Sequence, residues 1–324
     1  MNSTYIYSGS RLSVLASKLL SESQLERLLS AKSLDEAYAV LHDTYLSLHA
    51  SNFKPSGFEG LLEAGTMEAR KAILSCSPEP EKSAILWLPY DFSNLRTIIK
   101  AVRQNLSDDE TLSKLNPFGI FAPRELLTAF RSGKMRRFGK AMESAATEAM
   151  EAKESFMIDL ITDKHYFKEL SEIASRSKDL FIEKYSALLI DIFNIKATLR
   201  LDAIPSIVKE DVLVSGGTIS RRFLKDKGES KKSLIRLGGE KFFGQAVERY
   251  EESNSLAPIE KKLDEFRLEF VKRESNFNVF SVASLVWYFE SVKNSENIIR
   301  AVLSAKQTGL PEKELRDVLR KVLI

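Results

Sequence analysis

Two polar pairs in the chain consist of residue types that could do acid–base chemistry. Asp91 and Asn94 occur in the segment D-x-x-N-L-R-x-x-x-K, and Asp191 and Asn194 occur in D-x-x-N-I-K-x-x-x-R. The segments are 191 − 91 = 100 residues apart. Two carboxylates can serve as general acid and base, so one hypothesis is an enzyme with both Asp residues in one cleft. A catalytic group is needed once, however, whereas a packing device is needed in every repeat. We therefore favour a structural role in which each Asp and Asn bonds a neighbouring helix end.

The other reactive residues do not form a catalytic constellation. Cys76 is the only cysteine, so it cannot form an internal disulfide, and it has no nearby histidine or basic pair to activate it. His42 and His49 are seven residues apart, and we interpret them as ordinary surface or core histidines. Gly238-Gly-Glu-Lys241 lacks the rest of a phosphate-binding loop. We expect no catalytic residue, no cofactor and no metal site.

The first motif has a third, looser copy near the C-terminal end of the chain. It reads Asn294-Ser-Glu-Asn297-Ile-Ile-Arg300, with the Asp replaced and the basic residue one position late. A second motif, G-x-[FI]-x-x-R-x-L, begins at Gly119 and again at Gly217. Two motifs at matched separation predict three repeated units, which we place at 1–105, 106–204 and 205–324. The repeat motif comprises Asp91, Asn94, Arg96, Asp191, Asn194, Lys196, Asn297 and Arg300.

The elements that must position these residues have the pattern of helices. Apolar residues recur with helical spacing between 181 and 199, and again between 95 and 102. Ser33 with Glu36, and Ser107 with Glu110, have the spacing of a capping box. The 14 Gly and 9 Pro among 324 residues are too few for the many turns of a β-rich chain. We predict an all-α fold.

The charge balance and the hydropathy pattern limit the environments in which the chain can work. The 48 basic and 45 acidic residues give a net charge of +3, which is weak support for nucleic-acid binding. The longest apolar stretch, Val279 to Phe289, is shorter than the ~20 residues needed to cross a bilayer. The N-terminal segment lacks the basic start and apolar run of a signal peptide. We expect a soluble cytoplasmic protein that binds no nucleic acid.

Two basic clusters follow the second motif at equivalent places in the second and third units. The first contains Arg131, Lys134, Arg136, Arg137 and Lys140; the second contains Arg221, Arg222, Lys225, Lys227, Lys231 and Lys232. Two interpretations stay open: a solvated surface, or a rim that meets an acidic partner or anionic headgroups. As candidate partner contacts we select Arg131, Lys134, Arg136, Arg137, Arg221, Arg222 and Lys225.

At these motifs the chain resembles the C subunit of the rotary V/A-type ATPases, the counterpart of the d subunit of the eukaryotic V-ATPases. The resemblance covers nearly the whole chain and includes the segments 33–41, 90–96, 191–196 and 297–309. It implies a funnel of three similar helical domains around a pseudo-threefold axis. It also implies a rotor subunit whose wide side receives the tip of the central shaft and whose narrow side sits on the membrane rotor ring. Such a subunit hydrolyses no ATP and conducts no ions.

The resemblance further implies partners and a location. The partners would be the central-shaft subunits and the rotor ring, in a complex that holds one copy of this chain and transports protons or sodium ions. The chain would lie at the cytoplasmic face of the membrane, which it would touch only through the ring. The alternative is a generic all-helical adaptor or scaffold, although solenoid repeats of roughly 20–45 residues are shorter than the unit found here.

Overall fold

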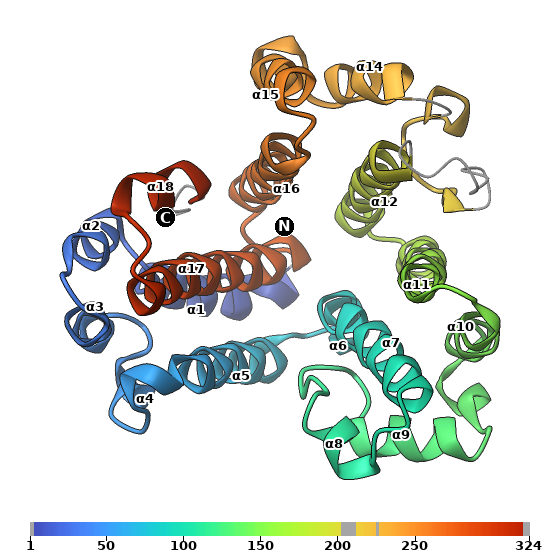
Figure 1. Cartoon of the computed structure of the whole chain (residues 1–324), viewed down its shortest axis with the longest axis horizontal. Helices are drawn as coiled ribbons and strands as arrows, with labels where there is room; N and C mark the ends of the chain where they lie inside the picture. The colour runs from blue at the N-terminus through green and yellow to red at the C-terminus, as the bar shows by residue number, and fades with distance from the viewer. Residues whose placement is uncertain (1–2, 202–211, 225–226, 320–324) are drawn as a thin grey trace. The chain divides into compact units, whose positions relative to one another are not determined.

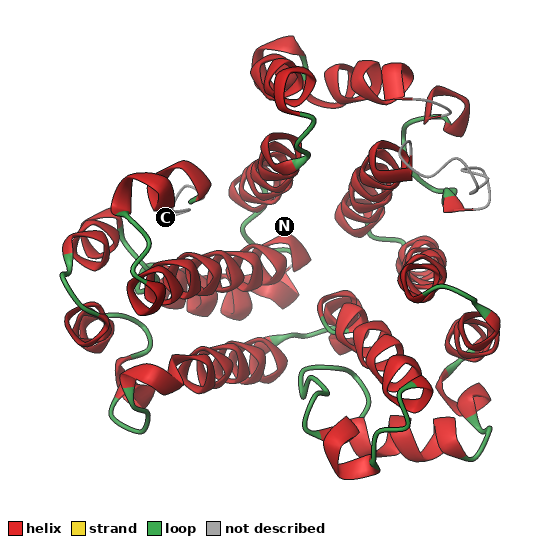
Figure 2. Ribbon diagram, in the orientation of Figure 1, coloured by secondary structure: helices red, strands yellow, loops and turns green. Residues whose placement is uncertain are grey.

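The computed structural model describes residues 3–201, 212–224 and 227–319, so that Lys225 lies outside the described residues. The described residues form α-helices and short 3-10 helices, and they contain no strand (Figures 1 and 2). The predicted all-α fold is confirmed. Within the described ranges, no helix combines the length and the apolar character that crossing a membrane requires.

The chain divides into two compact units. Unit 1 combines residues 1–83 with residues 268–324, and unit 2 consists of residues 84–267. The helix α16 (Ala257–Phe277) contributes residues to both units. The two boundaries proposed from the sequence, near residues 105 and 205, separate repeats and not compact units, and they remain predictions.

Unit 1 is built around one long helix near the C-terminal end of the chain. This helix, α17 (Val282–Thr308), packs against α1, α3 and α5. Its first turn is capped by the Ser281 hydroxyl, which accepts a hydrogen bond from the Ala283 N–H at 3.2 Å. Gly309 ends the helix with a φ of +73°, a left-handed conformation that glycine adopts without strain. The other elements are η1 (Ser3–Tyr5), α1 (Ile6–Ala16), α2 (Glu22–Ser30), α3 (Leu34–Val40), η2 (Leu41–Asp43), α4 (Ser47–Ala50), η3 (Pro55–Gly57), α5 (Phe58–Cys76), α6 (Pro80–Ser83) and α18 (Glu312–Val318).

Unit 2 contains the two helices that carry the better-matched motifs, α7 (Leu88–Arg103) and α12 (Leu180–Leu201). Helix α7 packs against α9, α10 and α11, and α12 packs against α11 and α14. The remaining elements are η4 (Ala84–Leu86), α8 (Asp108–Leu112), α9 (Pro123–Arg131), η5 (Met135–Phe138), α10 (Lys140–Glu151), α11 (Ser155–Ser177), η6 (Arg221–Leu224), α14 (Lys227–Gly238) and α15 (Glu240–Ser253). Each motif helix therefore has one face against neighbouring helices, as its apolar stripe requires.

The two expected capping boxes differ in the structure. The Ser107 hydroxyl accepts from the Glu110 N–H at 3.3 Å while the Glu110 carboxylate accepts from the Ser107 N–H at 2.8 Å, so this prediction is confirmed. At α3, the Ser33 hydroxyl accepts from the Glu36 N–H at 3.1 Å, but the Glu36 carboxylate accepts from the Lys32 N–H instead. The second box is therefore only half formed, because the carboxylate reaches one residue further back than the spacing predicted.

Candidate functional site

The buried carboxylate of Asp91 fastens a loop to helix α7. Asp91 has no exposed surface, and its two oxygens accept the N–H groups of Ile120 at 2.9 Å and Phe121 at 3.1 Å. One turn further along, the Asn94 side chain donates to the Asn116 carbonyl at 2.8 Å and accepts from the Asn116 N–H at 2.7 Å. The loop before α9 is thus held at both of its ends by α7.

Asp191 and Asn194 make the same contacts on helix α12. The Asp191 carboxylate accepts the N–H groups of Thr218 at 2.9 Å and Ile219 at 3.0 Å, and the Thr218 hydroxyl donates to it at 2.6 Å. Asn194 donates to the Val214 carbonyl at 2.8 Å and accepts from the Val214 N–H at 2.9 Å. Both carboxylates are occupied by backbone donors of their own loops, so these four motif residues hold loops in place.

The basic residues of the motif point to a different surface. Arg96 donates to the Thr162 hydroxyl at 3.1 Å, forms an ion pair with Asp163, and lies 3.4 Å from Asp159. Lys196 on α12 lies 3.6 Å from a carboxylate oxygen of Asp264 on α16. Arg96 and Lys196, 100 residues apart in sequence, line the same pocket of unit 2.

This pocket, which we call the docking pocket, has a volume of about 650 Å³. Its walls include Arg96, Asp159, Asp163, Lys196, Arg200 and Asp264, and its aromatic residues include Phe92, Phe156, Tyr166, Phe167 and Phe193. The rings of Phe167 and Phe193 are 4.5 Å apart between centroids, and those of Tyr166 and Phe167 are 4.6 Å apart. The lining therefore combines oppositely charged side chains with contacting aromatic rings, and protein interfaces are enriched in such aromatic residues.

Burial changes the acidity of one carboxyl in the docking pocket. It raises the pKa of Asp163 above its ordinary value, and the neighbouring Arg96 guanidinium partly opposes this increase. Asp159 and Asp163 were not among the residues selected from the sequence. The two residues are four positions apart on α11, which places both on one helix face. This spacing is the feature of the sequence by which they could have been identified as a pair.

The third motif copy differs in its contacts. Asn297 accepts from Arg300 at 3.1 Å, and Arg300 pairs with Glu59 at 3.0 Å. Asn294 is buried, as Asn94 and Asn194 are. Asn294 lies 200 residues after Asn94, so the buried asparagine is three residues earlier than Asn297, which matches the motif by type. Glu296, 200 residues after Arg96, is fully buried, whereas Arg96 is half-buried.

Glu296 is held by two partners on unit 1. It accepts a hydrogen bond from the Thr66 hydroxyl on α5, and the Lys293 ammonium lies 2.8 Å from its other oxygen. Arg96 likewise contacts a threonine, Thr162, on α11. An acidic side chain in unit 1 therefore occupies the position that a basic side chain has in unit 2.

The candidate contacts of the first basic cluster are largely paired within unit 2. Arg131 lies 3.2 Å from Asp108, Arg136 lies 3.0 Å from Glu143, and Arg137 lies 3.6 Å from Glu125. Lys134 is exposed. In the second cluster Arg221 lines a separate pocket of unit 2, while the side chain of Arg222 and the whole of Lys225 lie outside the described residues.

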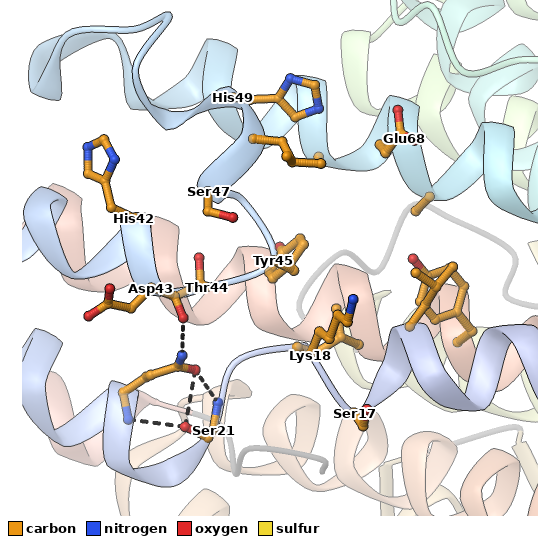
Figure 3. A pocket seen from close by; sticks show the side chains of 17 residues that line it. Ser17, Lys18, Ser21, His42, Asp43, Thr44, Tyr45, Ser47, His49 and Glu68 are labelled. Atoms are coloured by element: carbon orange, nitrogen blue, oxygen red, sulfur yellow. Dashed lines mark hydrogen bonds between the residues drawn. The ribbon is translucent and has the colours of Figure 1, made fainter.

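A cavity of about 650 Å³ in unit 1 is lined by both histidines noted in the sequence, together with other residues (Figure 3). His42 and His49 lie on different parts of its wall (Figure 3). In the part of the chain that the structure describes, no group of three or more His, Cys, Asp or Glu side chains could hold a metal ion.

Comparison with known proteins gives consistent matches along the chain. Residues 9–318 match a family model described as ATP synthase (C/AC39) subunit. The C subunit of the A-type ATP synthase of Methanocaldococcus jannaschii is 25% identical over 344 residues, covering 97% of this chain and 86% of the relative. The corresponding C subunit of Methanosphaera stadtmanae is 22% identical (97% and 87% covered), and that of Pyrococcus abyssi is 22% identical (97% and 90% covered).

Proposed function

The chain belongs to the ATP synthase (C/AC39) subunit family, and from this premise we propose that it is a non-catalytic subunit of the central rotor. In this role it is the socket that joins the central shaft to the membrane rotor ring of a rotary V/A-type ATPase or ATP synthase. It transmits torque and so serves proton or sodium transport. It lies at the cytoplasmic face of the membrane and touches the membrane through the ring.

The docking pocket carries this proposal. A shaft tip that presents an apolar side chain can place it against the aromatic rings of Phe156, Phe167 and Phe193. The surrounding charges, among them Arg96 and Lys196, can then pair with polar groups around that anchor. Stable interfaces have such a centre and rim, and they bury above about 1,000 Å² in total.

The pattern of helix packing supports a closed, threefold repeat. Helix α7 packs against α9, α10 and α11, which follow it in the chain, and α12 packs against the following α14. The last motif helix, α17, packs against α3 and α5 of the N-terminal part. These contacts are the ones expected if each motif helix packs on the next repeat and the last on the first, as the proposed pseudo-threefold funnel requires.

The loop contacts support the mechanical part of the role. A body that transmits torque must resist shear, and buried hydrogen bonds of fixed geometry resist it in addition to close packing. Asp91 and Asp191 each tie a loop to a long helix through two backbone N–H groups. The repetition of this contact is what a rigid coupling needs and what a single active site does not need.

The test is capture of the central-shaft subunits by variants of the full chain. Phe156→Asp places a charge in the docking pocket and is expected to reduce capture at least about tenfold. Phe277→Asp is the matched control, because Phe277 is 92% exposed and belongs to unit 1. Circular dichroism checks that both variants fold. The proposal that the docking pocket receives the shaft would be contradicted if Phe156→Asp captured the shaft subunits as well as the unaltered chain does. It would also be contradicted if Phe277→Asp reduced capture to the same extent.

A second measurement tests the candidate contacts of the basic clusters. The reversals Arg136→Glu, Arg137→Glu, Arg221→Glu and Arg222→Glu are expected to weaken assembly with the shaft or the ring while the chain still folds. The loss should be largest at low salt, since exposed charges are screened within about 8 Å at physiological ionic strength. Pull-down that is unchanged across a salt series would remove these residues from the interface.

A further inference from the structure

Unit 2 has a second pocket that is lined by basic side chains. It has a volume of about 390 Å³ and lies between helix α11 and the loop 213–215. Its lining residues include Lys164, Lys168, Ser171, Glu172, Ser215 and Arg221. None of these residues lines the docking pocket. The lining therefore brings three cationic side chains and one anionic side chain together.

Two of these cations are available for a ligand. Lys164 and Lys168 form no ion pair with any of the described residues, although the chain has many surface ion pairs. They are four residues apart on α11, and Ser171 follows three residues later, so all three side chains share one helix face. Lys164 is half-buried, which reduces the screening of its charge by water.

The opposite wall of the pocket is fixed in place by the repeat motif. Asn194 holds Val214 by two hydrogen bonds, and Asp191 holds Thr218, so the chain between them is anchored at both ends. Gly216 has a φ of +111°, and a Cβ at this residue would lie 2.8 Å from the Ser171 hydroxyl. Only glycine permits this close approach of the loop to α11. The wall is therefore preorganised rather than formed on binding.

We propose that this pocket binds a phosphate group. A phosphate carries up to two negative charges and several acceptor oxygens, which match the two ammonium groups, the Arg221 guanidinium and the hydroxyls of Ser171 and Ser215. The phosphate can belong to a soluble ligand or to a phospholipid headgroup, because the chemistry of recognition is the same. The inference does not depend on the proposed rotor function.

The experiment measures binding of pyrophosphate to the full chain by titration calorimetry at low ionic strength. The variant Lys164→Ala/Lys168→Ala removes the two unpaired cations and is expected to weaken binding by about tenfold or more. The variant Lys184→Ala/Lys241→Ala is the matched control, because it removes two exposed lysines that lie outside the pocket. Thermal melting of all three proteins checks that the substitutions leave the fold intact.

A parallel arm separates the two sources of phosphate. Cosedimentation with vesicles of phosphatidylcholine that contain phosphatidic acid is compared with vesicles of phosphatidylcholine alone. Lysine-dependent binding to pyrophosphate identifies a soluble phosphate ligand, and lysine-dependent binding to the acidic vesicles alone identifies a headgroup. The proposal is overturned if neither probe binds, or if the control variant loses as much binding as the pocket variant.

Discussion

Gly217 lies directly against the buried carboxylate of Asp191, so closely that a Cβ at Gly217 would be 2.1 Å from the Asp191 Oδ1 atom. Gly119 has the same relationship to Asp91, with a corresponding distance of 2.2 Å. These contacts explain why the two repeated motifs occur together. The carboxylate can receive the N–H groups that follow the glycine only if the loop backbone approaches without a side chain.

The variant Gly217→Ala is expected to destabilise the fold by about 1–3 kcal/mol, because the added methyl group must push the loop off the carboxylate. Urea unfolding measures the change. Gly57→Ala is the matched control, since a Cβ at Gly57 has no neighbouring atom within 4 Å. If Gly217→Ala were as stable as Gly57→Ala, the loop could move away from the carboxylate without loss of folding free energy, which would contradict this prediction.

The variant Asp191→Leu removes the acceptor from the N–H groups of Thr218 and Ile219 and is expected to destabilise the fold by about 1–3 kcal/mol. The exposed Asp109, in the first turn of α8, provides the control, and its replacement by Leu should change stability by less than about 1 kcal/mol. An unchanged melting temperature for Asp191→Leu would argue against a fastening role.

The variant Thr66→Val keeps the shape of the side chain but removes the hydroxyl that donates a hydrogen bond to the buried Glu296 carboxylate. We expect a loss of about 1–3 kcal/mol in the free energy of unfolding, because the carboxylate loses a charge-assisted hydrogen bond in a site without solvent. Thr147→Val on α10 is the control, since Thr147 is exposed and its hydroxyl bonds only the Glu143 carbonyl. Equal stability of the two variants would contradict the importance of the Thr66 contact.

The Tyr288 phenol should ionise at a higher pH than an ordinary tyrosine. Burial, assisted by the charge of Glu68, raises the pKa of Tyr288 from its ordinary value of 10.0 to about 12. Because the pKa is higher in the folded state, the neutral phenol contributes stability that is present below pH 10 and is lost as the pH rises to about 12. In an absorbance titration, part of the phenolate signal should therefore appear only near pH 12 in the folded protein. In urea the same signal should appear at the ordinary pH of tyrosine ionisation.

The variant Tyr288→Phe should remove one tyrosine from that late step. Tyr45 remains as an internal reference, because burial raises its pKa well above the ordinary value too. A late step of unchanged amplitude in Tyr288→Phe would mean that Tyr288 ionises with the exposed tyrosines.

The third motif copy illustrates where reasoning from residue types was insufficient. Asn297 and Arg300 match the motif by type, but both are only half-buried, whereas Asn294 and Glu296 are buried. The position on a helix face, and not the identity of the side chain, decides which residues enter the core. A match by type therefore selected neighbours one turn away from the buried positions.

The helical class and the recurrence of Asp91 and Asn94 at Asp191 and Asn194 could be predicted from the sequence, since spacing and residue type are local properties of the chain. The tertiary structure was needed to show that the Asp and Asn of the first two copies bind loops, while Arg96 and Lys196 line a common pocket. The partners Asp163 and Asp264 lie 67 and 68 residues further along the chain, as 163 − 96 and 264 − 196 show. Contacts over such separations depend on how the helices pack, and no local pattern encodes them.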